Sequence, residues 1–265
     1  MNWKDLEVSV NFPAEIVCEE AGTGETCITL TWTKGEYKAP ALNVTWAVPL
    51  VDIQYEWYPL CGRDRALRTD WDAPIHTSFS TGAPVFCFYN EEGQNRLTIA
   101  LSEVRLEALH SYGVHEEDGT LLCCLKLPLP MTGSAERYSV TLLRLRENMR
   151  YEAALRQVAA WWERVSDTHP MPVPTAARLP MYSTWYSFHQ ETVAADLEAT
   201  CVLAAQDGFR TVIVDDGWQT SDCTRGYGYC GDWQPAPEKI PDMRAHVARV
   251  HALGMKYMLW YSVVY

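Results

Sequence analysis

The C-terminal third of this chain contains the same local pattern twice. Residues 207–212 (Asp-Gly-Phe-Arg-Thr-Val) and 253–258 (Leu-Gly-Met-Lys-Tyr-Met) both have the composition of a helix end, a glycine and the start of an apolar strand. Glycine is common at this point because it enters the left-handed region that ends a helix without a steric penalty. Each pattern therefore predicts a helix followed by a strand, and alternating helices and strands predict parallel pairing.

Hydrophobic periodicity extends this reading over the rest of the segment. Strands are predicted at residues 179–186, 211–214 and 255–260, and helices at 190–206 and 245–253. A closed parallel β/α barrel contains eight strands in about 250 residues. The segment is too short for that, so it is predicted to be the N-terminal part of a (β/α)8 TIM barrel, truncated near the third strand, within a longer enzyme.

The first 148 residues have a different pattern, in which short stretches of alternating apolar and polar residues are separated by Gly, Pro, Asn and Asp. The clearest predicted strands are residues 26–32, 43–48, 85–89, 96–101 and 138–145. Residues 116–120 (Glu-Glu-Asp-Gly-Thr) predict a hairpin turn between two further strands. Many short strands with regular turns predict an all-β sandwich.

The chain changes character between these two parts. Apolar residues at helical spacing over 151–165 predict a helix, and Pro-Met-Pro-Val-Pro at 170–174 predicts a stiff extended linker. The predicted organisation is multidomain, β plus α/β. An N-terminal β-sandwich (1–148) is followed by a connecting helix and Pro-rich linker (149–177) and by the barrel segment (178–265).

Composition excludes several classes of function. Apolar residues make up 48% of the 265 residues, which indicates a folded core. The formal charge of −12 argues against nucleic acid, because phosphates would be repelled. No apolar stretch approaches the length of a membrane span, and the N-terminus has no apolar signal region. The predicted location is therefore the cytoplasm, with neither nucleic acid nor membrane as a partner.

Cysteine and histidine spacing predicts neither a metal nor any other cofactor. The nine cysteines include no CxxC pair, which favours reduced thiols over a disulfide framework or a zinc site. A disulfide between Cys223 and Cys230 stays open as an alternative. His246 and His251 are five residues apart and do not share a helical face as i, i+4 ligands do. His189 follows the first strand of the barrel segment and is interpreted as a surface residue.

The chemistry of the chain is expected where the second predicted barrel strand ends, at Asp215-Asp216-Gly217-Trp218. Two acids at the end of a buried strand are costly unless polar groups meet them. In a β/α barrel the site lies at this end of the strands. The alternative is a helix cap or a solvated Asp-Gly turn, although the following tryptophan is unusual there. The pattern favours carboxylates that bind sugar hydroxyls beside an aromatic ring.

Three blocks of sequence resemble the α-galactosidases and raffinose-synthase relatives of glycoside hydrolase family thirty-six, in clan D. They cover roughly residues 180–262. The blocks are Met181-Tyr182-Ser183-Thr184-Trp185-Tyr186; Val214-Asp215-Asp216-Gly217-Trp218 with Gly231-Asp232-Trp233 and Lys239-Ile240-Pro241; and His251-Ala252-Leu253-Gly254-Met255-Lys256 with Leu259-Trp260. Two positions depart from the family pattern. Residues 261–265 replace an acid-Pro-acid stretch, and Asp242-Met243 replaces a glycine.

The resemblance implies a substrate-binding role for Asp215 and Asp216, which would bind the 4- and 6-hydroxyls of galactose. It implies further that Trp185 and Trp260 line the sugar subsite and that Trp218 shapes its wall. Asp232 and Trp233 would support the site from the following loop. Trp260 could instead be a barrel-core side chain, and Asp232 a turn or helix-cap acid.

Neither catalytic carboxylate is predicted within this chain. Retaining glycosidases need two carboxyl groups about 5 Å apart. Adjacent strand residues such as Asp215 and Asp216 point to opposite faces unless the chain turns sharply, so they do not suit that pair. The resemblance implies a nucleophilic aspartate on the fourth strand and an acid/base on the sixth, both beyond Tyr265. The 265-residue chain alone is therefore predicted to be inactive.

The leading hypothesis is an α-galactosidase-like retaining glycoside hydrolase that acts on α-galactosides of oligosaccharides. This chain would carry the sugar-binding half of its active site. The first alternative is a transglycosylase of the raffinose-synthase type, or a hydrolase of another α-glycoside. The second is a non-catalytic sugar-binding protein. Because a third parallel strand without a neighbour exposes an edge, a homo-oligomer is a further expectation.

Overall fold

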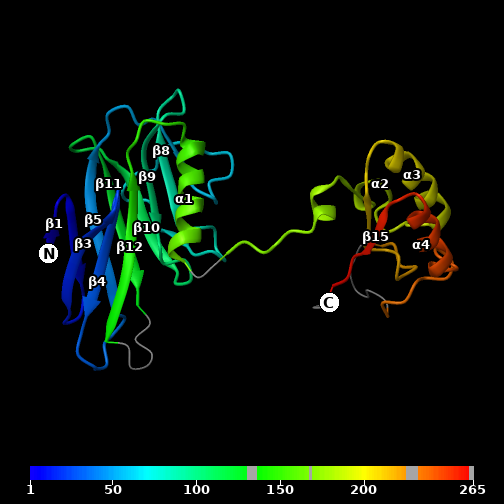
Figure 1. Ribbon diagram of the computed structural model, residues 1–265, viewed down its shortest axis with the longest axis horizontal. Helices are drawn as coiled ribbons and strands as arrows, with labels where there is room; N and C mark the ends of the chain where they lie inside the picture. Colours follow the sequence, from blue (N-terminus) through cyan, green and yellow to red (C-terminus); the bar gives the residue numbers. More distant parts are fainter. Residues whose placement is uncertain (130–135, 167–168, 225–231, 263–265) are drawn as a thin grey trace. The chain divides into compact units, whose positions relative to one another are not determined.

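The computed structural model describes residues 1–129, 136–166, 169–224 and 232–262. Its residues divide into two compact units, Met1–His169 and Pro170–Tyr265, and each is described by itself. Figure 1 shows the sheets of the first unit in blue to green and the helices and strands of the second in yellow to red.

The first unit contains two six-stranded antiparallel sheets. The first sheet has the order β1 (Asn2–Trp3), β2 (Leu6–Val10), β5 (Ala41–Pro49), β11 (Thr120–Pro128), β10 (Ala108–His115) and β7 (Ile75–Thr77). The second has the order β3 (Glu15–Gly22), β4 (Glu25–Thr31), β12 (Arg137–Leu145), β9 (Asn95–Leu101), β8 (Val85–Tyr89) and β6 (Tyr55–Trp57). The predicted all-β fold of this unit is confirmed.

The core of the first unit lies between the two sheets. Alternate residues of β5 and β11 are buried, as expected when one face of each strand packs inward. Phe86 on β8 of one sheet meets Tyr112 on β10 of the other edge to face, with ring centroids 4.9 Å apart. Both side chains are fully buried, so the two sheets share one hydrophobic core.

Helix α1 (Tyr151–Val165) has the predicted bounds and packs on the second sheet of the same unit. It buries Ala154, Val158 and Trp161 at helical spacing. The indole N–H of Trp162 donates to the backbone carbonyl of Leu101 at the end of β9, at 2.8 Å. The amphipathic pattern therefore predicted both the helix and the face that it buries.

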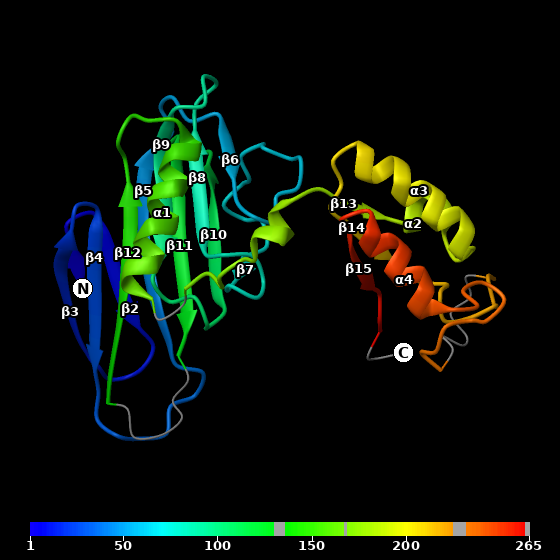
Figure 2. The ribbon, with the colours of Figure 1, turned by 45° about the vertical axis from the view of Figure 1, so that its right-hand side comes forward.

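The second unit is built on a three-stranded parallel sheet in the order β13 (Met181–Ser183), β14 (Thr211–Val214) and β15 (Lys256–Leu259). The helical segments of this unit are the 3-10 helix η1 (Thr175–Arg178), α2 (Trp185–Phe188), α3 (Ala194–Gln206) and α4 (Met243–Ala252). Figure 2 shows α3 and α4 next to the sheet. Parallel pairing is confirmed. The described residues do not close into a barrel, so the predicted barrel remains a proposal.

The two repeated helix–glycine–strand joints form as predicted. Gly208 after α3 and Gly254 after α4 have φ values of +92° and +75°, a backbone conformation that residues with a Cβ rarely adopt. After each joint the chain continues as a strand of the parallel sheet, β14 after α3 and β15 after α4. Leu197 and Cys201 of α3 and Val250 of α4 then pack with Val212 and Val214 of β14 in one buried cluster.

The predicted boundaries in this unit were wrong by one or two residues at β13, α4 and β15, and by more at two places. The strand predicted over 179–186 ends at Ser183, because the backbone N–H groups of Phe188 and His189 donate back to the carbonyls of Thr184 and Trp185 and form α2. Trp185 is therefore a helix residue. The helix predicted from Gln190 begins at Ala194. The described residues include no helix that is both long and apolar enough to span a membrane.

Candidate functional site

The loop that follows β14 meets the ends of both neighbouring strands. The backbone N–H of Asp215 donates to the hydroxyl of Thr184 after β13, at 3.0 Å. The backbone N–H of Trp260 after β15 donates to the carbonyl of Val214, at 2.9 Å. The carboxyl ends of the three strands are thereby tied together, and the acidic pair lies at the middle one.

The carboxylate of Asp216 is buried and held by two glutamine side chains. It is 3% exposed. Its Oδ2 accepts from Nε2 of Gln190 at 2.5 Å, and its Oδ1 accepts from Nε2 of Gln219 at 2.6 Å. A buried charge is tolerated when hydrogen bonds replace water. Sequence reasoning predicted the acid but missed both glutamines.

Asp215 is placed differently from its neighbour. It is only partly buried, and its Oδ1 accepts from the backbone N–H of Asp216 at 2.8 Å. Within the described residues its carboxylate has no other hydrogen-bond partner. One acid of the pair is thus enclosed by protein, and the other keeps accepting capacity for a ligand.

The tight loop at Gly217 requires a glycine. Its φ is +113°, and a Cβ there would lie 2.4 Å from the backbone oxygen of Gln190. The close approach places several backbone carbonyls near one another, and the ammonium group of Lys239 binds them. Its Nζ donates to the carbonyls of Gln190 (2.7 Å), Gly217 (2.8 Å) and Thr220 (2.6 Å). Sequence reasoning did not assign a role to Lys239.

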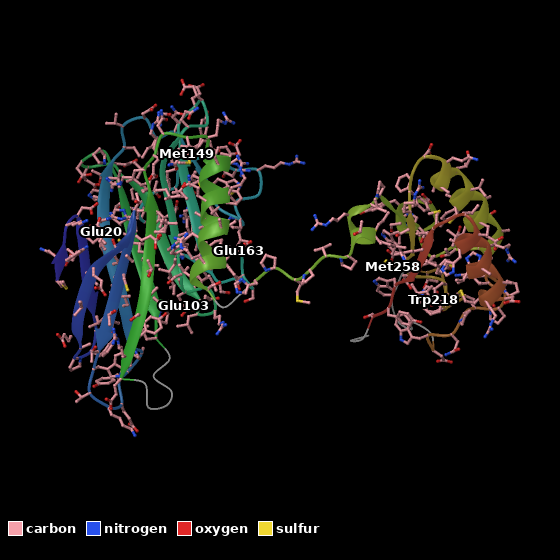
Figure 3. All side chains as sticks on the ribbon, in the orientation of Figure 1. Glu20, Glu103, Met149, Glu163, Trp218 and Met258 are labelled. Atoms are coloured by element: carbon pink, nitrogen blue, oxygen red, sulfur yellow. The ribbon has the colours of Figure 1, made fainter. Side chains whose placement is uncertain are left out.

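Aromatic rings cluster beside the acidic pair. Trp218, which is labelled in Figure 3, is 1% exposed. The centroid of its ring lies 6.2 Å from that of Trp233 and 5.2 Å from that of Tyr261. The rings of Trp233 and Trp260 lie 5.7 Å apart. Trp233 and Trp260 are partly exposed, whereas Trp218 is buried and contacts both of them.

The remaining predicted site residues lie at the margins of this cluster. Trp185 opens α2, is partly buried and meets the ring of His189 at 5.3 Å. Asp232 is exposed. The disulfide considered between Cys223 and Cys230 falls outside the described residues, because Cys230 is not among them. The thiol of Cys223 donates to the backbone carbonyl of Gln190 at 3.4 Å.

A second polar cluster lies between α3, α4 and β15, and its side chains hydrogen-bond to one another. His246 is fully buried, with Nδ1 2.7 Å from Glu198 and Nε2 3.1 Å from the hydroxyl of Tyr257. Arg249 donates to the same glutamate at 2.6 Å. This hydrogen bond is the main cause that lowers the pKa of Glu198; partial burial opposes it, and the bond to His246 adds to it. No group of three or more potential metal ligands occurs in the described parts of the chain.

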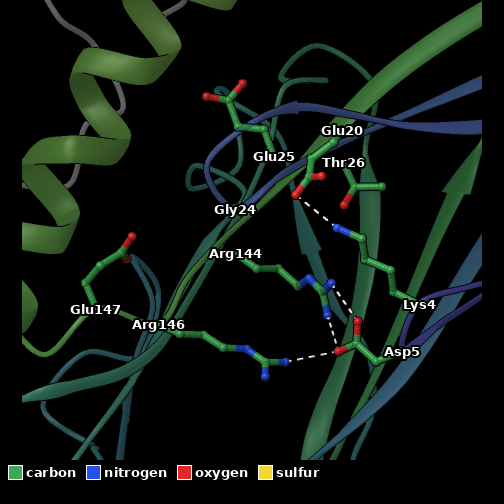
Figure 4. Close-up of a pocket in the computed structure, with 9 residues that line it drawn as sticks. All are labelled: Lys4, Asp5, Glu20, Gly24, Glu25, Thr26, Arg144, Arg146 and Glu147. Atoms are coloured by element: carbon green, nitrogen blue, oxygen red, sulfur yellow. Dashed lines mark hydrogen bonds and ion pairs between the residues drawn. The ribbon is translucent and has the colours of Figure 1, made fainter.

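A solvent-open groove of ≈ 600 Å³ in the first unit is lined by charged residues, and its lysine and two arginines pair with carboxylates of the same groove (Figure 4). Arg144 binds Asp5 at 2.7 Å, and Lys4 binds Glu20 at 2.9 Å. The hydrogen bond from Arg144 is the main cause that lowers the pKa of Asp5. Because the basic groups of this groove already pair within the protein, the loop after β14 is the better candidate site.

No family model matches the chain, and no curated protein matches it. Solved structures of α-galactosidases resemble it in fold. The family thirty-six enzyme AgaB from Geobacillus stearothermophilus aligns with a TM-score of 0.51 and 17% identity, over 97% of this chain and 38% of the enzyme. TtGalA from Thermus thermophilus, in complex with stachyose, aligns at 0.50 and 17%, over 93% and 51%. AgaA from Geobacillus stearothermophilus aligns at 0.50 and 14%, over 98% and 43%.

At sequence identities of 14–17%, the similarity to these solved structures is evidence for the fold of the chain alone. The chain spans about two fifths to half of the length of the structures that it resembles.

Proposed function

We propose that this chain carries the sugar-binding part of an α-galactosidase-like retaining glycoside hydrolase. The observation that carries the proposal is the acidic pair at the end of β14, where Asp216 is buried and oriented while Asp215 keeps a carboxylate oxygen for a ligand. The likeness of fold to solved α-galactosidases supports the same conclusion independently.

The proposed ligand is the galactose unit of an α-galactoside. A carboxylate accepts hydrogen bonds from two neighbouring hydroxyls, and charge-assisted bonds of this kind are stronger than neutral ones. Asp215 and Asp216 would take the 4- and 6-hydroxyls. Asp215 has a carboxylate oxygen without a partner in the described residues, whereas each oxygen of Asp216 already accepts from a glutamine and would accept the hydroxyl on a remaining lone pair. The partly exposed rings of Trp233 and Trp260 offer apolar faces for the C–H groups of a sugar, and Trp185 lies at the margin. TtGalA is in complex with stachyose, which supports an oligosaccharide as the substrate here.

The proposed reaction is double displacement with retention. The nucleophile and the acid/base would come from later strands of a longer polypeptide, because a retaining glycosidase needs two carboxyl groups on either side of the scissile bond and both oxygens of Asp216 are engaged by glutamines. The three parallel strands would then be the first three of a (β/α)8 barrel. Such barrels bind substrates at the carboxyl ends of their strands, where the acidic pair lies. The proposed location is the cytoplasm, which the eight free thiols of the described residues support.

Sugar binding by the 265-residue chain is the direct test. Methyl α-D-galactopyranoside and its 4-epimer, methyl α-D-glucopyranoside, are titrated into ¹⁵N-labelled protein and followed by NMR. We expect the galactoside to shift the signals of residues 184–190 and 215–220 and to bind at least about tenfold more tightly than the glucoside. Equal affinities, or no shifts from either sugar, would contradict the proposal.

Activity is tested with a polypeptide that extends beyond Tyr265 and a panel of nitrophenyl glycosides. Release of nitrophenol from the α-galactoside alone supports the hydrolase. Turnover of a different α-glycoside keeps the fold assignment and replaces the sugar. Product that forms only when a sugar acceptor is added indicates the transglycosylase, and binding without turnover indicates the non-catalytic alternative.

A further inference from the structure

The most unusual buried charge in the second unit is Lys239, which precedes Ile240-Pro241 in a turn between β14 and α4. It is only 8% exposed. A lysine ammonium has three N–H donors and no acceptor, and here they are directed at three backbone carbonyls between 2.6 and 2.8 Å away. The buried ammonium is solvated by the protein backbone, and this accounts for the tolerance of a charge at this position.

The three carbonyls come from both loops that contribute to the candidate site. The carbonyl of Gln190 lies in the loop between α2 and α3, and those of Gly217 and Thr220 lie in the loop after β14. Gly217 brings the two loops into contact, because a Cβ at this position would overlap the backbone of Gln190. Lys239 therefore links two loops by hydrogen bonds, although the loops are separated in sequence by more than twenty residues.

The residues fastened in this way are those that hold Asp216. The side chain of Gln190 donates to one carboxylate oxygen and that of Gln219 to the other, at 2.5 and 2.6 Å. Gln219 is itself fixed, since its Oε1 accepts from the backbone N–H of Gly217 at 3.0 Å. A shift of either loop would change the direction or the length of one of these two bonds.

Lys239 is in turn held by backbone contacts outside the site. Its N–H donates to the carbonyl of Ala236 at 3.0 Å, and its own carbonyl accepts from the N–H of Ala194 at the start of α3, also at 3.0 Å. The N–H of Ala236 donates to the carbonyl of Trp218 at 2.9 Å. The turn that carries the lysine is thus attached to both loops that its side chain connects.

We propose that Lys239 is a positioning residue: its ammonium sets the separation of the loops that carry Gln190 and Gln219, and thereby the placement of the Asp216 carboxylate for a sugar ligand. The last clause rests on the proposed function. The lysine does not touch the ligand in this proposal, and it acts through backbone carbonyls and two carboxamides.

The experiment compares the wild-type chain with Lys239→Met, which removes the ammonium and keeps most of the side-chain volume. Lys256→Met is the matched control, because Lys256 is an exposed lysine of the same unit. The readout is hydrogen exchange of the Gln190 and Gln219 carboxamide protons, assigned by their loss in Gln190→Leu and Gln219→Leu. We expect Lys239→Met to accelerate this exchange about tenfold or more, with no change in the control.

Affinity for methyl α-D-galactopyranoside is measured on the same samples. We expect a loss of about tenfold in Lys239→Met and a smaller loss in Lys239→Gln, whose carboxamide can still donate to two of the three carbonyls. Carboxamide exchange within about twofold of wild type in a folded Lys239→Met protein overturns the proposal.

A measurement on the wild-type chain decides the matter if Lys239→Met does not fold. The ammonium protons of Lys239 are expected to exchange at least about tenfold more slowly than those of Lys256, and equal rates overturn the proposal.

The experiments distinguish a failure of the proposed sugar-binding function from a failure of the positioning role of Lys239. If wild-type protein binds no galactoside while carboxamide exchange depends on Lys239, the proposed function fails and the placement of Asp216 by Lys239 stands. If the galactoside binds equally to wild type and Lys239→Met, the positioning role fails and the proposed function stands.

Discussion

The indole N–H of Trp218 donates to the backbone carbonyl of Trp260 at 3.0 Å. This bond joins the loop after β14 to the end of β15, in addition to the ladder between the two strands. Because Trp218 is also buried against Trp233 and Tyr261, one side chain connects the acidic loop to the aromatic cluster.

Replacing Trp218 with phenylalanine should therefore lower the stability of the second unit. The ring contacts are partly kept, but the carbonyl of Trp260 loses its donor and a small cavity forms. We expect a loss of about 1–2 kcal/mol in the free energy of unfolding, measured by urea denaturation. Trp71→Phe, at a tryptophan that is 64% exposed in the first unit, should change it by less than about 0.5 kcal/mol. Equal effects at the two sites would contradict the buried role of Trp218.

Gly217→Ala should be much more costly than Gly254→Ala. Both glycines have positive φ, so both substitutions carry backbone strain of about 1 kcal/mol or more. Only at Gly217 does the added Cβ meet the backbone, 2.4 Å from the oxygen of Gln190, whereas nothing lies within 4 Å of a Cβ at Gly254. We expect Gly217→Ala to destabilise the unit by about 2 kcal/mol more than Gly254→Ala. Thermal and urea unfolding of the two variants, compared side by side, provide the check.

Asp216→Asn should impair both the loop and the function. The asparagine amide has one acceptor oxygen where the carboxylate has two, so one of the two glutamine N–H₂ groups would face another N–H₂ group. In a polypeptide that extends beyond Tyr265, we expect activity on an α-galactoside to fall about a hundredfold or more. A fall of less than about threefold would remove Asp216 from the site.

Asp215→Asn is the informative partner of that variant. Its carboxylate receives one backbone hydrogen bond from within the described residues, so the substitution should leave the free energy of unfolding within about 0.5 kcal/mol of wild type. Affinity for methyl α-D-galactopyranoside should nevertheless fall about tenfold, because a charged acceptor is lost. An unchanged affinity would show that Asp215 does not bind the sugar.

Acid should destabilise the second unit through Glu198. Its pKa in the folded protein is below the ordinary value of 4.5, chiefly because Arg249 donates a hydrogen bond to it. The unfolded chain therefore binds this proton more readily than the folded one. The associated stability is present above pH 4.5 and is lost as the pH falls through the folded pKa. Urea unfolding between about pH 6 and 3 should show this slope, reduced in Glu198→Gln and unchanged in Glu191→Gln, a substitution at an exposed glutamate.

The elements that could be predicted from the sequence are those with their own start and stop signals. Helix α1 and strands β8 and β14 have the predicted bounds. For α1 the amphipathic pattern is continuous, and for β14 the apolar run lies between a helix-ending glycine and two acids. Strands β6 and β7 have three residues each. They could not be predicted because pairing with neighbouring strands defines them, rather than a pattern of their own.

The candidate site was predicted in part for a similar reason. Paired acids followed by tryptophan are distinctive, so the location of the site could be inferred. Gln190, Gln219 and Lys239 are of common residue types, and their roles depend on a tertiary approach between two loops. The error at Trp185 has the same origin: Trp185 and Tyr186 suit a strand by composition, but the hydrogen bonds after Thr184 fold this segment into α2.

The aromatic cluster has an optical consequence. Among the ring contacts of the described residues, the pairs formed by two tryptophans, Trp218 with Trp233 and Trp233 with Trp260, belong to the second unit. Indoles at this separation share their electronic excitation, so their circular dichroism is a property of the pair and changes when either ring turns. The chain thus contains a built-in spectroscopic probe at the end of its parallel sheet, which reports ring movement there without an attached label.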